Sequence, residues 1–209
     1  MQIGKKVGIM GGTFNPIHMG HLILAENARE AFQLDEVLFI PSGVPYMKKD
    51  VLDSKFRISM VELAIEDNHF FSLSKIEVEK VGYSYSYETI ATLKENNPNH
   101  IYYFIVGADA LFSMEKWKCP EKIFKECIIL VATRDNYDDV SLKKQRDYLN
   151  AKFKGNIFLI PTRNIELSST DIRNRVIHNQ SIRYMVPENV FNFIKNNKLY
   201  VNESMKEDK

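Results

Sequence analysis

The stretch KVGIMGGTFNPIHMGHLILAENA, residues 6–28, decides the fold, because it joins an apolar run to a glycine turn and then to a helical pattern. Residues 6–10 form a short β-rich run, and Gly11 and Gly12 follow it directly. Apolar residues from Leu24 onward then recur with the spacing of an amphipathic helix. A strand, a turn and a helix in this order predict the first βα unit of a parallel sheet.

Similar apolar, β-rich runs recur along the rest of the chain, at residues 36–41, 70–79, 101–107, 127–133 and 156–161. Several of them are apolar continuously rather than alternately, which suits strands that are buried on both faces of a parallel sheet. Helical patterns lie between them, for example over residues 56–64. We therefore predict an α/β fold: a single doubly wound, Rossmann-like domain with a mostly parallel sheet of about six strands and helices on both faces.

The end of the chain reads as a small helical part. In LSSTDIRNRVIHN, residues 167–179, Ser168 and Asp171 have the spacing of a capping box and predict a helix start. In VPENVFNFIKNN, residues 186–197, we expect a last helix with Pro187 in its first turn and with Val190 and Ile194 buried. The polar residues 201–209 are expected to be a tail, which leaves residues 1–200 as one domain.

Composition excludes several classes of protein. The chain has 209 residues, with 28 Lys plus Arg against 27 Asp plus Glu, so its net charge favours neither nucleic acid nor an anionic membrane as partner. No apolar run approaches the length of a membrane span, and no export signal opens the sequence. Two cysteines are too few for a disulfide framework. We expect a cytoplasmic protein; the sequence leaves open whether it is a homodimer.

The glycine turn and the histidines after it suggest a site for an anion. Glycines let the backbone approach a ligand closely, and N–H groups beside a helix N-terminus attract phosphate. The spacing matches neither the dinucleotide fingerprint nor the P-loop, so a purely structural turn remains an alternative. His18 and His21 share a face if the helix starts here. The other three histidines are scattered along the chain, so we predict no metal site in the protein itself.

Two segments carry a more specific resemblance. GGTFNPIHMGH, residues 11–21, and LSSTDIR, residues 167–173, resemble the two signatures of the HxGH nucleotidyltransferases. Between and after them, IPSGVPYMK, GYSYSYET, GADALFSMEKW and MVPENVFNFI follow the order seen in bacterial nicotinate-nucleotide adenylyltransferases. The resemblance covers nearly the whole chain. It implies an adenylyltransferase (nucleotidyltransferase) domain that transfers AMP from ATP to nicotinate mononucleotide, giving deamido-NAD and pyrophosphate in NAD biosynthesis.

The same resemblance assigns the site residues. It implies catalytic roles for His18, His21, Arg173 and Lys48. It implies ATP binding by Gly11, Gly12, Thr13, Phe14, His18, Gly20, His21, Asp109, Ser168, Ser169, Thr170 and Arg173. It implies binding of nicotinate mononucleotide by Asn15, Lys48, Ser86, Asp109 and Trp117. Asp109 would accept a hydrogen bond from a ribose hydroxyl, Trp117 would stack on the pyridine ring, and the main chain at Ser86 would help to recognise the carboxylate.

The implied reaction explains why the signature has two histidines and no general base. A phosphate monoester has a second pKa of about 6, so the attacking group is already an anion near neutral pH. Catalysis then consists of holding two polyanions in line and stabilising the charge that develops on the transferred phosphoryl group. We therefore interpret the histidines as hydrogen-bond donors to the phosphates. Mg²⁺ is expected to bind through the ATP phosphates rather than through a protein cage.

Some positions depart from the family pattern, and alternatives remain. The usual Pro-Pro-His-Lys is Pro45-Tyr46-Met47-Lys48 here, and Asn15 stands where Asp is frequent. An enzyme that prefers nicotinamide mononucleotide differs by only a few hydrogen bonds. A phosphopantetheine adenylyltransferase is a second alternative, against which His18 and Trp117 argue. A catalytically silent nucleotide-binding regulator is the third.

Overall fold

The computed structural model describes residues 4–44, 51–132, 139–160 and 167–201. Its described strands form one parallel sheet in the order β3-β2-β1-β4-β5-β6. Their bounds are β1 (Lys6–Gly12), β2 (Glu36–Pro41), β3 (Phe71–Leu73), β4 (Ile101–Gly107), β5 (Cys127–Ala132) and β6 (Ile157–Ile160). The strand order reverses between β1 and β4, which confirms the predicted doubly wound sheet. In folds of this class, that reversal is where ligands bind.

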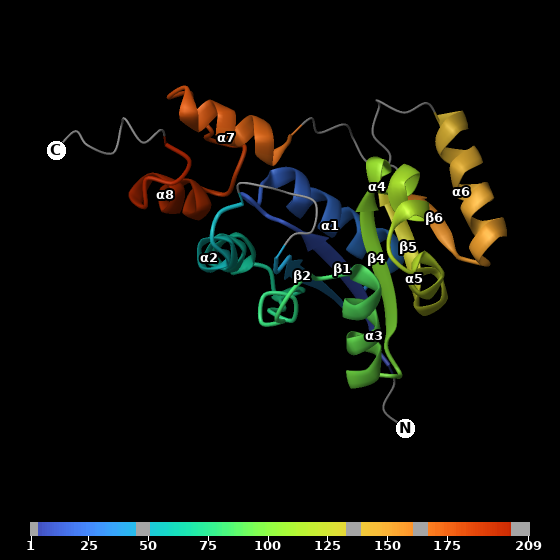
Figure 1. The fold of residues 1–209 in the computed structure, drawn as a ribbon. Helices are drawn as coiled ribbons and strands as arrows, with labels where there is room; N and C mark the ends of the chain where they lie inside the picture. The colour runs from blue at the N-terminus through green and yellow to red at the C-terminus, as the bar shows by residue number, and fades with distance from the viewer. Residues whose placement is uncertain (1–3, 45–50, 133–138, 161–166, 202–209) are drawn as a thin grey trace.

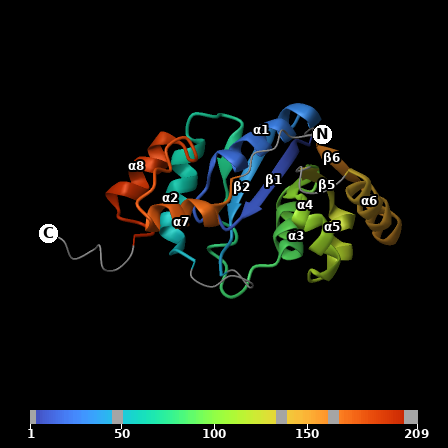
Figure 2. The same cartoon turned by 90° about the horizontal axis from the view of Figure 1, so that it is seen from above.

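Helices cover both faces of the sheet (Figures 1 and 2). Their bounds are α1 (Met19–Phe32), α2 (Ser54–Ile65), α3 (Ser86–Asn96), α4 (Ala108–Ser113), α5 (Pro120–Glu126), α6 (Asp139–Phe153), α7 (Ser169–Ile177) and α8 (Glu188–Asn196), with a 3₁₀ turn η1 (Met114–Lys116) after α4. One core cluster joins the sheet to α1, α2, α7 and α8, and a second joins it to α3, α4, α5 and α6. Helices α2, α7 and α8 gather at one end of the molecule in both views.

The central strand β4 shows why the apolar runs are continuous. Tyr103 and Ile105 belong to the first core cluster, whereas Phe104 and Val106 belong to the second. Because successive side chains of a strand point to opposite faces, a strand covered by helices on both sides needs an apolar residue at every position. The prediction that these strands are buried on both faces is confirmed.

Three predicted bounds were wrong. The first strand was predicted to end at Met10, but β1 continues through Gly11 and Gly12, which pair with Ile40 and Pro41 of β2. The run 70–79 forms a strand only over Phe71–Leu73, which pairs with β2 at the edge of the sheet. Beyond it, the main-chain N–H of Ile76 donates to the Ser74 side chain, so a local hydrogen bond replaces the ladder. Pro187 is the N-cap of α8 rather than a first-turn residue, although Val190 and Ile194 are buried as expected.

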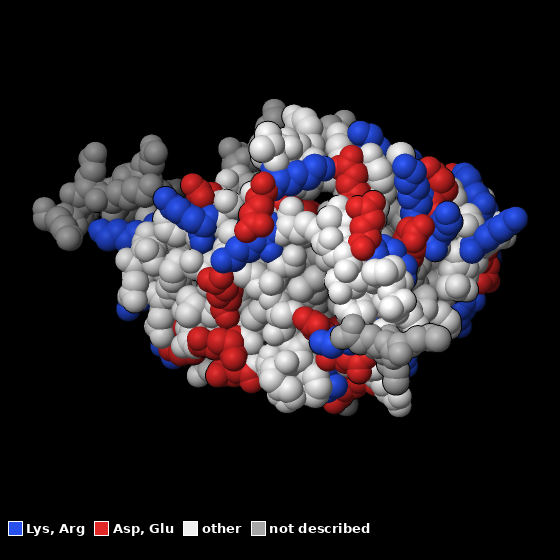
Figure 3. All heavy atoms as spheres, turned by 90° about the horizontal axis from the view of Figure 1, so that it is seen from below, with Lys and Arg blue, Asp and Glu red and all other residues white. Residues whose placement is uncertain are grey.

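The surface carries no extended patch of one charge on the face shown in Figure 3, where acidic and basic side chains are interspersed. In the part of the chain that the structure describes, no helix has the length and apolar character needed to cross a membrane.

Candidate active site

The glycine turn lies where the strand order reverses. Strand β1 ends at Gly12, which is paired with Pro41 of β2, and its other neighbour is β4. Asp109 is exposed in the first turn of α4, directly after β4 ends. The sheet therefore brings the turn and Asp109 to adjacent strand ends, as the sequence predicted for two parts of one site.

The two histidines occupy the N-terminus of α1. His18 is the N-cap and His21 the third helical residue, and their ring centroids lie 3.8 Å apart. The main-chain N–H of His18 donates to Nδ1 of His21 at 3.3 Å. An imidazole nitrogen that accepts a hydrogen bond carries no proton, so the proton of a neutral His21 ring sits on Nε2. Local geometry thus makes Nε2 the nitrogen through which a neutral His21 ring can donate a hydrogen bond.

Gly20 leaves room for the His18 ring, which is only 4% exposed. A Cβ on Gly20 would lie 3.1 Å from both Cε1 and Nδ1 of His18 and 3.6 Å from Cβ of Leu167, which precedes α7. The first distance is closer than an ordinary van der Waals contact, so a side chain would displace the ring. At this predicted ATP-binding position, the absence of a side chain therefore preserves the packing of His18.

This packing makes Gly20→Ala a sharp test. Alanine favours a helix over glycine by about 1 kcal/mol, so we expect the Tm to stay constant or rise. Displacement of the His18 ring by a few tenths of an ångström is expected to lower kcat by about tenfold, because catalysis depends steeply on geometry. Thermal denaturation and steady-state kinetics on one preparation check both parts. A variant with wild-type kcat would show that the ring position is unimportant.

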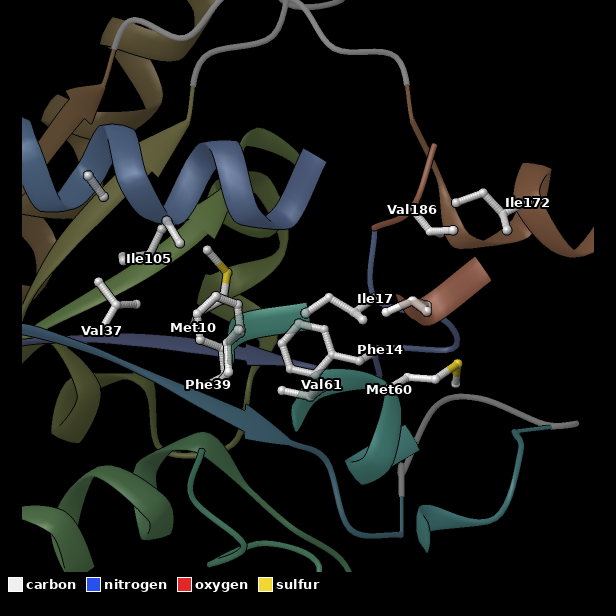
Figure 4. Packing of buried hydrophobic residues seen from close by; sticks show 14 of the residues in the cluster. Met10, Phe14, Ile17, Val37, Phe39, Met60, Val61, Ile105, Ile172 and Val186 are labelled. Atoms are coloured by element: carbon white, nitrogen blue, oxygen red, sulfur yellow. The ribbon is translucent and has the colours of Figure 1, made fainter. Parts of the chain in front are cut away.

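The turn itself is held by Phe14. This residue has φ +49°, a left-handed conformation that non-glycine residues adopt rarely. Its ring is buried beside Met10, Ile17, Phe39 and Val61 (Figure 4). The same ring meets His21 edge-on, with centroids 5.1 Å apart. Burial of the side chain thus offsets the cost of the left-handed backbone conformation at this residue.

Donors from distant segments bind the carbonyl groups of the turn. Arg57 of α2 donates to Thr13 O at 2.9 Å, and Arg173 of α7 donates to Asn15 O at 2.8 Å. The Ser169 hydroxyl donates to Pro16 O at 2.8 Å, and the main-chain N–H of Ser42 donates to Gly12 O at 2.8 Å. These bonds tie the first signature to the second across more than 150 residues.

The second signature begins α7 as predicted. Ser168 is the N-cap, and its Oγ accepts from the Asp171 N–H at 3.0 Å. Arg173 lies one turn into the helix and also donates to Thr170 Oγ1 at 3.3 Å. Ser169 of α7 binds Pro16 O just before α1, and Gly20 of α1 lies close to Leu167 just before α7. The N-termini of α1 and α7 therefore lie next to each other at the turn. Two helix N-termini beside one glycine turn form a setting that favours a polyanion.

The residues predicted to bind the pyridine ring lie on the face of the sheet that is covered by α3, α4 and α5. Ser86 is the first residue of α3, and its N-cap Tyr85 provides no side-chain cap. Trp117 packs edge-on against Phe104, and its Nε1 donates to Ser113 Oγ at 3.2 Å. Lys118 connects the two segments, since its Nζ lies 4.0 Å from the centroid of the Tyr85 ring. The predicted catalytic residue Lys48 lies outside the described residues.

Two contributors to the site have no counterpart in the predictions. Arg57 is 2% exposed and donates to Thr13 O of the glycine turn, a contact between segments that the sequence pattern does not indicate. Tyr200 donates to Oδ1 of Asn15 at 2.9 Å, and burial raises the pKa of its phenol, which keeps it a donor. Asn15 is itself 5% exposed, and its Oδ1 is bound by Tyr200. The side-chain atom that remains for the predicted contact with substrate is the amide nitrogen.

Comparison with known proteins agrees with this geometry. A family model described as Cytidylyltransferase-like matches residues 9–175. A probable nicotinate-nucleotide adenylyltransferase of Clostridium botulinum (strain Eklund 17B / Type B) is 41% identical over 201 residues, which cover 95% of the chain and 100% of the relative. The chain belongs to the nicotinate-nucleotide adenylyltransferases. A relative from Moorella thermoacetica with the same name is 42% identical over 198 residues, which cover 93% of the chain and 91% of the relative.

Solved structures agree with the fold of this nicotinate-nucleotide adenylyltransferase family member. The Plasmodium falciparum nicotinic acid mononucleotide adenylyltransferase complexed with NaAD superposes with a TM-score of 0.79 at 20% identity, covering 94% of the chain and 97% of that structure. A putative nicotinate-nucleotide adenylyltransferase from Vibrio parahaemolyticus gives a TM-score of 0.67 at 24% identity, covering 94% and 95%. At these identities the likeness concerns the fold.

Proposed function

We propose that the chain catalyses transfer of AMP from ATP to nicotinate mononucleotide, giving deamido-NAD and pyrophosphate in NAD biosynthesis. The observation that carries this proposal is the His18–His21 pair, whose tilted rings are in contact at the N-terminus of α1 beside the glycine turn and the start of α7. The relatives with full-length coverage support the substrate.

The chemistry needs positioning rather than proton removal. A phosphate oxygen of nicotinate mononucleotide forms a bond to the α-phosphorus of ATP, and the bond from that phosphorus to the bridging oxygen breaks. The electron pair of the broken bond leaves with pyrophosphate. The attacking oxygen is already anionic near neutral pH. The protein has to hold both anions in line and stabilise the developing charge.

The described residues are suited to that task. His21 Nε2 is fixed as a donor by the hydrogen bond at Nδ1, and the N-termini of α1 and α7 add main-chain donors and positive partial charge. Arg173 supplies a cation one turn into α7. We assign His18 and His21 to the transferred phosphoryl group and its neighbours, and Arg173 to the departing pyrophosphate. Lys48 is proposed as an additional cation for the phosphates.

Mg²⁺ is proposed to enter with ATP. Among residues 4–44, 51–132, 139–160 and 167–201, no group of three or more His, Cys, Asp or Glu side chains is placed to hold a metal ion. Mg²⁺ keeps several waters and commonly binds through substrate phosphates, so the donor set fits a metal that arrives on the nucleotide. When bound, it would neutralise part of the triphosphate charge.

Positive charge beside Trp117 supports the acid as substrate rather than the amide. The ammonium group of Lys118 lies over the Tyr85 ring at the start of α3, whose N-terminus adds positive partial charge, and Glu88 in the first turn of this helix offsets part of that charge. A nicotinate carboxylate in this place gains electrostatic attraction that a neutral nicotinamide does not. Selection between the two depends on such differences of a few interactions.

A substrate panel tests the proposed function. The protein is incubated with ATP and Mg²⁺ and, separately, with nicotinate mononucleotide, nicotinamide mononucleotide or phosphopantetheine, while pyrophosphate release is followed. We expect the highest kcat/KM with nicotinate mononucleotide. Equal or faster turnover of the amide would overturn the substrate, and tight ATP binding without pyrophosphate from any acceptor would point to a regulator.

A further inference from the structure

Arg57 is a buried cation that binds main-chain oxygens. It lies in the first turn of α2 and is 2% exposed. Its guanidinium donates to Leu52 O at 2.9 Å, Thr13 O at 2.9 Å and Gly43 O at 3.4 Å. In the described part of the chain, no carboxylate lies within 4.0 Å of it. Burial lowers the pKa of the guanidinium, and Arg remains a cation at neutral pH.

Burial of a charge without an ion-pair partner costs free energy. A helix that only had to pack on the core would be more stable with an apolar residue at this position, as at the neighbouring buried positions Met60 and Val61. The three acceptors come from separate segments: the glycine turn, the exit of β2 and the residues before α2. The planar guanidinium can donate in three directions at once, which a single ammonium group does with less geometric definition.

The bond to Thr13 O fixes the orientation of one main-chain N–H in the turn. In a planar trans peptide, the N–H points opposite to the C=O. The bond from Arg57 to Thr13 O therefore turns the Phe14 N–H away from α2. Further along the turn, Arg173 holds Asn15 O of the Asn15–Pro16 peptide at 2.8 Å, so a second arginine binds the same loop. Phe14 has φ +49°, a conformation that depends on support from its surroundings.

A second anchor point adds to this rigidity. A Cβ on Gly43 would lie 2.1 Å from the Glu77 carbonyl oxygen, so the chain passes close to a neighbouring segment at that residue. Arg57 joins this tightly packed point to the glycine turn through one side chain. Displacement of the guanidinium would break the connection between the glycine turn and the closely packed chain at Gly43.

We infer that Arg57 is a positioning residue for adenylyl transfer: its buried guanidinium holds the Thr13–Phe14 peptide so that the Phe14 N–H faces the phosphates of ATP. Arg57 does not touch substrate; it acts through the main chain of the turn. The inference rests on the proposed function, because it assigns the oriented N–H to that reaction.

The test compares Arg57→Met and Arg57→Lys with Met60→Ala as a matched control. Met60 is fully buried one turn further along α2, so its truncation destabilises the same helix and leaves the guanidinium in place. We expect Arg57→Met to lower kcat by about tenfold with less than a threefold change in KM for nicotinate mononucleotide. Met60→Ala should lower the Tm but keep kcat within about twofold of the wild type. Arg57→Lys should lie between Arg57→Met and the wild type, with kcat reduced about threefold.

Each outcome separates the inference from the proposed function. Wild-type protein without turnover of nicotinate mononucleotide would overturn the function itself. An active wild type together with an Arg57→Met variant whose kcat equals that of Met60→Ala would overturn only the role of Arg57. Should Arg57→Met fail to fold, Arg57→Lys decides: a threefold lower kcat at a Tm within a few degrees of wild type supports the inference, and an unchanged kcat contradicts it.

Discussion

Replacing His21 by alanine is expected to lower kcat by about 10²- to 10³-fold, the loss that follows removal of one preorganised donor to a developing anion. The structure gives this donor a defined identity. The His18 N–H occupies Nδ1 of His21 at 3.3 Å, so the proton that faces a ligand is on Nε2. His18→Ala is expected to have an effect of the same size, because its ring contacts that of His21, with centroids 3.8 Å apart, and helps to fix that orientation.

His21→Gln is the matched control for this prediction. The glutamine amide places an N–H near the position of the imidazole Nε2, but it cannot act as an imidazole acid or base. If His21 is an electrostatic donor, His21→Gln keeps more activity than His21→Ala in steady-state assays. A loss confined to KM, or equal losses in both variants, would contradict a donor role in the transition state.

Arg173→Met is expected to lower kcat by about 10²-fold or more, because this residue serves two purposes. Its Nη1 holds the Asn15 carbonyl of the glycine turn, and the proposed function assigns its charge to the departing pyrophosphate. Loss of the side chain therefore removes a cation and loosens the turn. The measurement is kcat with saturating ATP and nicotinate mononucleotide.

Arg175→Met is the control for that variant, since Arg175 lies on the same helix and donates instead to Ser181 O. It should keep kcat within about twofold of the wild type. Arg173→Lys should recover part of the loss, because it restores charge without the planar fork. Similar kcat values for the Arg173→Met and Arg175→Met variants would show that the contact of Arg173 with the turn is only structural.

Local patterns in the sequence were sufficient to predict the overall fold. The strands are continuous apolar runs because helices cover both faces, as Tyr103 and Phe104 of β4 show by joining opposite core clusters. Ser168 marks the start of α7 through a cap that depends on residues three apart. Such signals lie within one element, so they can be read without knowledge of the tertiary structure.

What the sequence did not predict depends on contacts between distant segments. Arg57 and Thr13 are 44 residues apart, and Tyr200 and Asn15 are 185 apart, so no periodicity connects them. The strand at residues 70–79 was predicted too long because apolar residues recur along the whole run, whereas only Phe71–Leu73 has a partner strand. The pairing with β2 stops at Phe39 although β2 continues to Pro41, and composition does not specify where such an edge pairing stops.

The most direct test of the account is the position of the triphosphate relative to the two imidazole rings. A crystal structure with a non-hydrolysable ATP analogue and Mg²⁺ measures it. The account predicts a phosphate oxygen within hydrogen-bond distance of His21 Nε2, with the triphosphate lying over the glycine turn and the N-terminus of α7. A triphosphate bound away from both rings would contradict it.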